Sequence, residues 1–244
     1  MTRREWPRRV AALAQLRVTD LEHPVLGRDD EHHLRTVLRA RMGEEVVVSD
    51  GNGSWALCEV RDTGLARVTP VLHDDPAPAT TLYLVPLKGE RSEWAVAKAT
   101  ELGVSRIVPL VSERLAVKFK GETRAKIVGR WRRIAAEACG QSRRTYDIVV
   151  DEPVRVRDVP SQVAVADFEG ESDWSGVRAV AVGPEGGWER DEWPAPRRRL
   201  SLGPTVLRAE TAGVVAASLL AFGAGDWGFT LGGARIGKDE SNHE

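Results

Sequence analysis

Short apolar runs alternate with helical patterns from about residue 80 onward. The runs are rich in β-branched residues and are bounded by glycine or proline, as buried parallel strands are. They predict strands over 80–87, 106–111, 146–150 and 162–168, and two shorter strands that begin at Val180 and Leu200. Apolar residues at helical spacing predict helices over 91–102, 123–139 and 206–221. This alternation predicts an α/β domain with a mostly parallel sheet and helices on both of its faces.

The first 75 residues have a different pattern. Leu34, Val37 and Leu38 have the spacing of one helical face and predict a short helix within 31–39. Three strands are predicted after it, over 45–50, 54–60 and 65–72, and the first two are joined by a glycine turn at 50–53. Several short strands with glycine turns in so few residues predict a small β-barrel.

A linker separates the two patterns. Residues 73–79 are acidic and rich in proline, which disfavours regular structure. We therefore place a domain boundary after residue 75, with a first domain over 1–75 and a second over 76–232. The polar stretch 233–244 has the composition of a disordered tail.

Composition and charge narrow the class of protein. The 244 residues are 42% hydrophobic and 29% charged, which is typical of a globular domain. No apolar run approaches the roughly 18–20 residues of a membrane span, and the charged N-terminus lacks the apolar core of a signal peptide. Cys58, Cys139 and five histidines give no metal-ligand spacing, and two distant cysteines fit a reducing cytosol. These features predict a cytoplasmic protein without a membrane segment or a metal.

The net charge of −1 means that any RNA-binding surface must be a local basic patch, because most strong nucleic-acid binders are basic overall.

Two glycine-containing loops follow the predicted strands at Val180 and Leu200. The first reads Gly183-Pro184-Glu185-Gly186-Gly187, and the second contains Gly203-Pro204. Neither matches the glycine spacing of a phosphate-binding loop. Glycines directly after strands allow close approach of the backbone to a ligand, and ligands of open α/β sheets lie beyond the carboxyl ends of the strands. Together the loops predict one ligand pocket.

The same two segments resemble a known family. Residues 183–187, followed by Leu-Gly-Pro-x-x-Leu-Arg-x-Glu-Thr-Ala over 202–212, are similar to the 16S ribosomal RNA uridine-N3 methyltransferases of the SPOUT superfamily. The resemblance spans roughly residues 7 to 222 and includes the motif His-His-x-x-x-Val-Leu-Arg over 32–39. One departure is clear: the family usually has glutamate and glycine where this chain has Gly140 and Arg143.

The resemblance implies a fold and a cofactor. The expected fold is a SPOUT-type trefoil-knotted parallel sheet domain preceded by a small PUA-like β-barrel domain that binds RNA. The expected cofactor is S-adenosyl-L-methionine, held in a cleft where glycines leave room for main-chain contacts and apolar side chains form the walls. The expected cofactor-binding residues are Val182, Gly183, Pro184, Glu185, Gly186, Gly187, Leu202, Gly203, Val206, Leu207, Thr211 and Ala212.

The implied reaction sets requirements on the catalytic residues. N3 of uridine is protonated and lies on the pairing edge, so the base must be unpaired and must lose a proton. Arg208 is the candidate that stabilises charge on a uracil oxygen, and Glu210 is the candidate proton acceptor. Glu210 is alternatively a carboxylate favoured by the N-terminus of its helix.

The implied partners are 16S ribosomal RNA or the small ribosomal subunit, and a second copy of the chain in a homodimer. Basic side chains are the candidates for RNA contacts, because arginine suits phosphate groups. Each of them is alternatively a solvated surface charge, and His32 and His33 are alternatively a partly buried helix start. The candidate RNA-binding residues are Arg8, Arg9, His32, His33, Arg35, Arg39, Lys88, Lys98, Arg114, Arg143 and Arg144.

Three other functions stay open at this point. The chain could be a non-catalytic RNA-binding relative, although its intact glycine loops argue against this. It could be a SPOUT enzyme that acts on another base or on ribose. A nucleotide-binding α/β enzyme of the doubly wound type is disfavoured by the missing glycine fingerprint.

Overall fold

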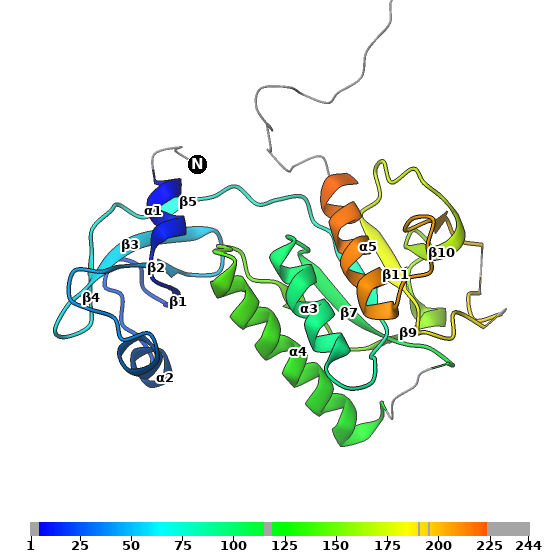
Figure 1. The fold of residues 1–244 in the computed structure, drawn as a ribbon, viewed down its shortest axis with the longest axis horizontal. Coiled ribbons are helices and arrows are strands. Elements are labelled where there is room, and N and C mark those ends of the chain that lie inside the picture. The colour runs from blue at the N-terminus through cyan, green and yellow to red at the C-terminus, as the bar shows by residue number, and fades with distance from the viewer. Residues whose placement is uncertain (1–4, 115–118, 190, 195, 224–244) are drawn as a thin grey trace, which may run out of the picture.

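The chain forms two sheets, each with its own core, that lie side by side in the computed structural model (Figure 1). The structure describes residues 5–114, 119–189, 191–194 and 196–223. The predicted tail 233–244 lies outside these residues. Residues 74–80 connect the two sheets.

The N-terminal part is built on a five-stranded sheet in the order β1-β2-β3-β4, with β5 also paired to β3. The β1–β2 pair is parallel and the other pairs are antiparallel. Leu16, Leu34 and Val46 belong to its core. The elements are α1 (Trp6–Ala11), β1 (Gln15–Arg17), α2 (Arg28–His32), a π-helix (His33–Val37), β2 (Glu45–Ser49), β3 (Ser54–Val60), β4 (Leu65–Arg67) and β5 (Leu72–His73).

Two sequence-based expectations for this part differ from the structure. The single strand predicted over 65–72 is wrong: β4 and β5 are separate strands that pair with different halves of β3. Thr69 and Pro70 lie in the gap, where the Thr69 hydroxyl accepts the Leu57 amide and proline has no N–H to donate. The expected barrel is observed as a sheet, and β1 and β4 do not pair with each other within the described residues.

The C-terminal part is built on a seven-stranded sheet in the order β12-β10-β11-β6-β7-β8, with β9 also paired to β7, and every pair is parallel. The mostly parallel sheet expected from the sequence is therefore confirmed. The strands are β6 (Thr81–Leu84), β7 (Arg106–Val111), β8 (Val149–Val150), β9 (Val154–Arg155), β10 (Ala164–Glu171), β11 (Ala179–Val182) and β12 (Arg199–Leu200).

The helices lie on one face of this sheet. Helices α3 (Arg91–Glu101), α4 (Gly121–Gln141) and α5 (Ala209–Gly223) share a core with the inward residues of the strands, which includes Trp131 and Leu220 (Figure 1). The opposite face is covered by a 3-10 turn (Val156–Asp158) and by Trp188 and Trp193. The prediction of helices on both faces is thus wrong for the described residues. The connection between β11 and β12, which covers part of the second face, is a loop.

Two further boundaries were predicted too long. The strand predicted over 146–150 is reduced to Val149–Val150, because Tyr146 forms an antiparallel bridge with Asn52 of the first domain. The helix predicted from 206 begins at Ala209, because residues 203–208 form a loop.

Candidate cofactor-binding site

A cavity of about 1080 Å³ opens at the carboxyl ends of β10, β11 and β12. The loops after β11 and β12 line it, together with the first turn of α5. This is the location that the two glycine-containing loops predicted, and parallel strands bring their carboxyl ends to one edge of the sheet. The described structure therefore has a real pocket between the two segments.

The loop after β11 folds back so that its residues pack against one another. A Cβ on Gly183 would lie 2.9 Å from Cε2 of Trp188, so no larger residue fits without moving that ring. Gly187 has φ +69°, a conformation that favours glycine. The buried Glu192 carboxylate accepts the main-chain amides of Glu113 and Glu189 at 2.7 and 3.0 Å, which fixes the far end of the loop.

The loop after β12 presents main chain and apolar side chains. Gly203 has φ +128°, and its amide donates to the Ser201 hydroxyl at 3.2 Å. Leu202 and Leu207 are partly buried against the main core, whereas Val206 is 88% exposed. This loop combines main-chain groups with apolar walls, as nucleoside pockets do.

A third wall comes from β10, which carries no glycine signal before the pocket. Residues 165–169 line the cavity, as do Trp193 and Arg197. The guanidinium of Arg197 lies 5.0 Å from the Trp193 ring centroid and donates to the Val159 carbonyl at 2.8 Å, and burial lowers the pKa of this arginine. Sequence reasoning missed this wall, because only the strand order β12-β10-β11 places β10 between the two loops.

Arg91 joins the two cofactor loops electrostatically. Its guanidinium lies 2.6 Å from a Glu185 oxygen and 3.7 Å from Oε2 of Glu210, so one cation from α3 faces a carboxylate from each side of the pocket. The Glu210 side chain is 12% exposed, and its Oε2 has no hydrogen-bond partner among the described residues. This bridge was not predicted, because nothing local in the sequence ties residue 91 to 185 and 210.

Most of the predicted cofactor-binding residues line the cavity: Val182, Gly183, Pro184, Glu185, Gly187, Leu202, Gly203, Val206, Leu207 and Ala212. Gly186 and Thr211 belong to the same segments but do not line it. The two candidate catalytic residues, Arg208 and Glu210, flank the cavity without lining it. Arg208 is exposed and Glu210 is directed to Arg91.

Three of the predicted RNA-binding arginines are used inside the molecule. Arg9 is 3% exposed and bonded to Asp74. Arg143 donates to the Ala12 carbonyl at 2.6 Å, and Arg144 donates to two carbonyls of the second domain. The Arg9 and Arg143 guanidinium groups join the two domains, whereas that of Arg144 binds its own domain. All three are engaged within the molecule, which differs from the exposed basic surface that the sequence suggested.

The remaining candidates are at the surface, several of them in ion pairs with neighbouring carboxylates. Arg8 pairs with Glu45, Arg35 with Glu31, Lys98 with Glu101 and Arg114 with Glu189. His32, His33, Arg39 and Lys88 are exposed, and Arg39, two residues after the end of the π-helix, has φ +53°. π-helical turns are often found at functional sites.

Two electrostatic features bear on stability and reactivity. The hydrogen bond from Arg114 lowers the pKa of the exposed Glu189 carboxyl. Burial raises the pKa of the Cys58 thiol to about 11 and also raises that of Cys139.

The described residues hold no cluster of His, Cys, Asp or Glu placed for a metal ion. Among the described helices, none has the length and apolar character needed to cross a bilayer.

Comparison with known proteins decides the family. A family described as an RNA methyltransferase domain matches residues 74–221, more than half of the chain. The chain belongs to this RNA methyltransferase family. A second family, described as an RNA methyltransferase PUA domain, matches residues 26–69 of this methyltransferase chain.

Relatives and solved structures agree with this assignment. The ribosomal RNA small subunit methyltransferase E of Mycobacterium bovis is 34% identical over 79% of this chain and 83% of its own length. A putative methyltransferase from Legionella pneumophila, in complex with the bound cofactor SAM, has a TM-score of 0.71 at 28% identity, covering 84% of this chain and 96% of its own. A ribosomal RNA small subunit methyltransferase E from Neisseria gonorrhoeae bound to S-adenosyl methionine has a TM-score of 0.69 at 26% identity, covering 86% and 97%.

Proposed function

We propose that this chain transfers a methyl group from S-adenosyl-L-methionine to N3 of one uridine in the 16S ribosomal RNA of the small subunit. The observation that carries the proposal is the cavity between the loops at 183–187 and 202–207, the two segments that resemble the uridine-N3 methyltransferases. The relatives named ribosomal RNA small subunit methyltransferase E support the substrate class.

The residues around the cavity fit the cofactor. The loop after β12 offers main-chain groups for the adenine edge, and Leu202 and Leu207 offer apolar surface for its faces. The Glu185 carboxylate lines the pocket, where a negative charge favours a cationic ligand. When bound, the cofactor supplies an electrophilic methyl group and a sulfonium charge.

The protein must prepare the acceptor nitrogen. The target uridine leaves its stack so that N3 reaches the pocket. Glu210 accepts the N3 proton, and Arg208 stabilises the negative charge that develops on a uracil oxygen. Arg91 holds Glu210 and Glu185 in place in the free protein. Positioning of donor and acceptor supplies much of the remaining acceleration.

The RNA surface of this proposal excludes the three internal arginines. It consists of basic residues from both domains, of which Arg35 and Lys98 are partly exposed and the others are exposed: Arg8, His32, His33, Arg35, Arg39, Lys88, Lys98 and Arg114. The proposed domains are an RNA-binding PUA-like domain over 1–75 and a methyltransferase domain over 76–232, and the proposed location is the cytoplasm. Phosphate contacts predict that affinity falls steeply with salt.

The proposal includes a deep trefoil knot. The connection from β11 to β12 crosses β10, because β10 lies between these strands in the sheet. Leu200 is partnered by both Ala166 and Glu171 of β10, and a Cβ on Gly170 would lie 2.5 Å from its backbone. A segment enclosed in this way by an earlier strand supports threading of the chain through a loop.

The proposal also includes a homodimer. Partly exposed residues at 214, 215, 218, 219 and 222 follow helical spacing along α5, and four of these five side chains are apolar. Such a stripe on an outer helix favours burial against a second copy, near the cavity that α5 helps to form.

A complementation experiment tests the proposed function. The chain is expressed in bacteria that lack their own ribosomal RNA small subunit methyltransferase E, and nucleosides of the 16S RNA are measured by mass spectrometry. We expect one N3-methyluridine to return with the unchanged chain and to stay absent with Glu210→Gln. A methyl group on ribose or on another base would replace N3 with a different acceptor atom. The absence of any new methylation would refute the proposed function.

A further inference from the structure

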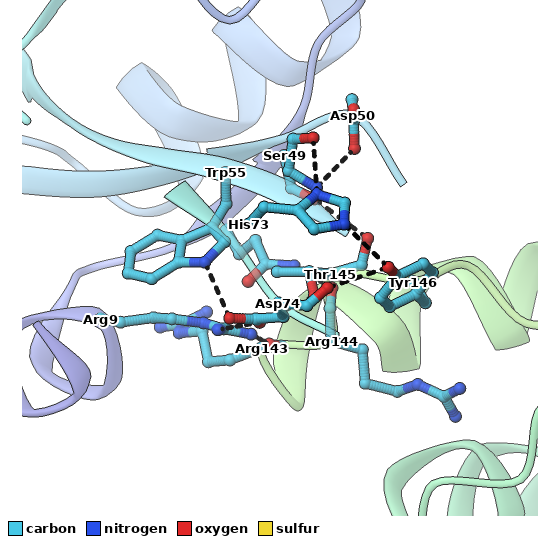
Figure 2. A network of polar contacts seen from close by, with 12 residues as sticks. Arg9, Ser49, Asp50, Trp55, His73, Asp74, Arg143, Arg144, Thr145 and Tyr146 are labelled. Carbon is cyan, nitrogen blue, oxygen red and sulfur yellow. Dashed lines mark hydrogen bonds and ion pairs between the residues drawn. The ribbon is translucent and has the colours of Figure 1, made fainter. Parts of the chain in front are cut away.

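Asp74 is the centre of a partly buried polar network between the two domains. It directly follows β5, and its carboxylate accepts from Arg9 Nη1 at 2.6 Å, from Thr145 Oγ1 at 2.9 Å and from Trp55 Nε1 at 3.2 Å (Figure 2). Arg9 and Trp55 belong to the first domain, whereas Thr145 follows α4 of the second. One carboxylate thus binds side chains from both domains.

Arg9 is fixed on all sides. Its guanidinium carbon lies 5.3 Å from the Trp6 ring centroid and 4.8 Å from that of Trp55. Its second amino group donates to the Arg143 carbonyl, which belongs to the second domain. A buried guanidinium with an ion pair, two aromatic contacts and a main-chain acceptor has a single geometry.

The segment after α4 completes the junction from the other side. Arg143 has φ +60°, and its side chain donates to the carbonyls of Ala12 at 2.6 Å and Gly140 at 3.1 Å. A Cβ on Gly140 would lie 3.2 Å from the Gln15 carbonyl oxygen, so a side chain there would press on the first domain. Gly140 and Arg143 therefore both lie at the junction.

The same segment is anchored to the core of the second domain. Arg144 donates to the Thr100 and Val104 carbonyls at 2.7 Å each. Main-chain hydrogen bonds cross the junction as well, from the Gly53 amide to the Thr145 carbonyl at 3.1 Å and from the Asp147 amide to the Gly51 carbonyl at 2.9 Å. The first domain is thus bound to a segment that is itself hydrogen-bonded to the methyltransferase core.

Stabilisation of the fold alone does not explain the polar groups at this junction. Arg9 Nε, Arg143 Nε and Gln15 Oε1 are buried and have no hydrogen-bond partner among the described residues. Buried charges and unsatisfied polar atoms are costly to a fold, and their clearest benefit is a unique arrangement. Without such contacts, domains joined by a short linker are expected to move relative to each other.

We propose that the junction centred on Asp74 sets the distance and orientation between the RNA-binding surface of the first domain and the methyl-transfer cavity of the second. This inference rests on the proposed function. Asp74, Arg9 and Arg143 are then positioning residues: none of them lines the cavity, and they act by presenting the bound RNA at one fixed distance from it.

The test combines a distance measurement with a transfer measurement. Spin labels are placed on cysteines introduced at Met42, which is exposed on the first domain, and at Arg124, which is exposed on α4. The native Cys58 and Cys139 are buried and stay unlabelled. We expect one narrow distance distribution in the unchanged chain and a broad one in Asp74→Asn, which keeps the side-chain shape and removes the charge.

The transfer measurement separates positioning from folding. Asp74→Asn should bind S-adenosyl-L-methionine within twofold of the unchanged chain and lose at least tenfold in kcat/KM on small ribosomal subunits. Thr145→Val, which removes only one bond to Asp74, should shift both readouts in the same direction and serves if Asp74→Asn does not fold. Asp151→Asn is the matched control, since it breaks a 2.6 Å pair with Arg106 away from the junction, and it should change neither readout.

Each outcome decides between the alternatives. A narrow, unchanged distance in both junction variants would overturn the inference, as would a broad distance with undiminished transfer. Parallel loss of cofactor affinity and transfer would assign the junction a general structural role instead. If the unchanged chain transfers no methyl group to any RNA, the proposed function fails. If the unchanged chain is active and the junction variants keep its distance or its transfer rate, only this inference fails.

Discussion

Replacing Gly183 with alanine is the sharpest test of the pocket wall. The added Cβ would lie 2.9 Å from Trp188 Cε2 and 3.2 Å from its Cζ2 and Nε1, closer than carbon atoms normally approach. The ring has little freedom to retreat, because it packs edge-on against Trp193 at 4.9 Å between centroids. Both rings line the cavity. Gly183→Ala therefore displaces the Trp188 ring, which forms one wall of the cavity.

The size of the effect follows from the crowding. Overpacking of this kind costs about 1–3 kcal/mol. A free energy of about 1.4 kcal/mol corresponds to a factor of ten in affinity. If cofactor binding requires the Trp188 ring in its original position, S-adenosyl-L-methionine should bind about 5- to 150-fold more weakly. Isothermal titration calorimetry measures this directly. Gly186→Ala is the matched control: the nearest atom to its Cβ is Arg114 Cδ at 3.6 Å, an ordinary contact, so affinity should stay within about twofold.

A double variant tests the cause. Trp188→Phe removes the indole atoms that the new Cβ would meet, so Gly183→Ala should cost less in that background than in the unchanged chain. Such coupling is expected only for groups in contact. Equal losses in both backgrounds, or unchanged affinity in Gly183→Ala alone, would show that the wall at Gly183 does not set cofactor binding.

Three further predictions concern single groups. Glu210→Gln should keep cofactor affinity but lower single-turnover methylation about 10²- to 10⁴-fold, and an unchanged rate would remove Glu210 from the chemistry. Arg91→Ala should weaken cofactor binding only about two- to fivefold, because the pairs that it breaks with Glu185 and Glu210 are partly exposed; calorimetry would detect a larger role. With the Cys58 thiol pKa raised to about 11, little thiolate forms at pH 8, so Cys58 and the buried Cys139 should resist a thiol reagent such as Ellman's until the protein unfolds; rapid reaction of the native chain would contradict their burial.

Local patterns in the sequence predicted the parts of the fold that depend on local order. The strand over 106–111 is β7 and the strand over 54–60 is β3, because both are continuous β-branched or apolar runs with clear ends. The glycine loops at 183–187 and 202–207 border one cavity because parallel strands place their carboxyl ends together.

Features that depend on distant parts of the chain could not be predicted in the same way. The β10 wall of the pocket requires the strand order, and the Arg91 bridge requires α3 to lie beside α5. Arg9 and Arg143 have the composition of a surface patch, but Arg9 is buried against Asp74 and Trp55, and the Arg143 side chain binds the Ala12 carbonyl. Asp74 lies 65 residues from Arg9, and Ala12 lies 131 residues from Arg143, so the sequence around each arginine carries no sign of these partners.

The most direct measurement of the central claim uses purified protein, small ribosomal subunits that lack the modification, and S-adenosyl-L-methionine with a ¹³C-labelled methyl group. After digestion, the account predicts that the label appears in N3-methyluridine, at one site per subunit, and that Gly183→Ala transfers it at a rate limited by cofactor binding. Label in any other nucleoside, or an unchanged rate of transfer in Gly183→Ala, would contradict this account.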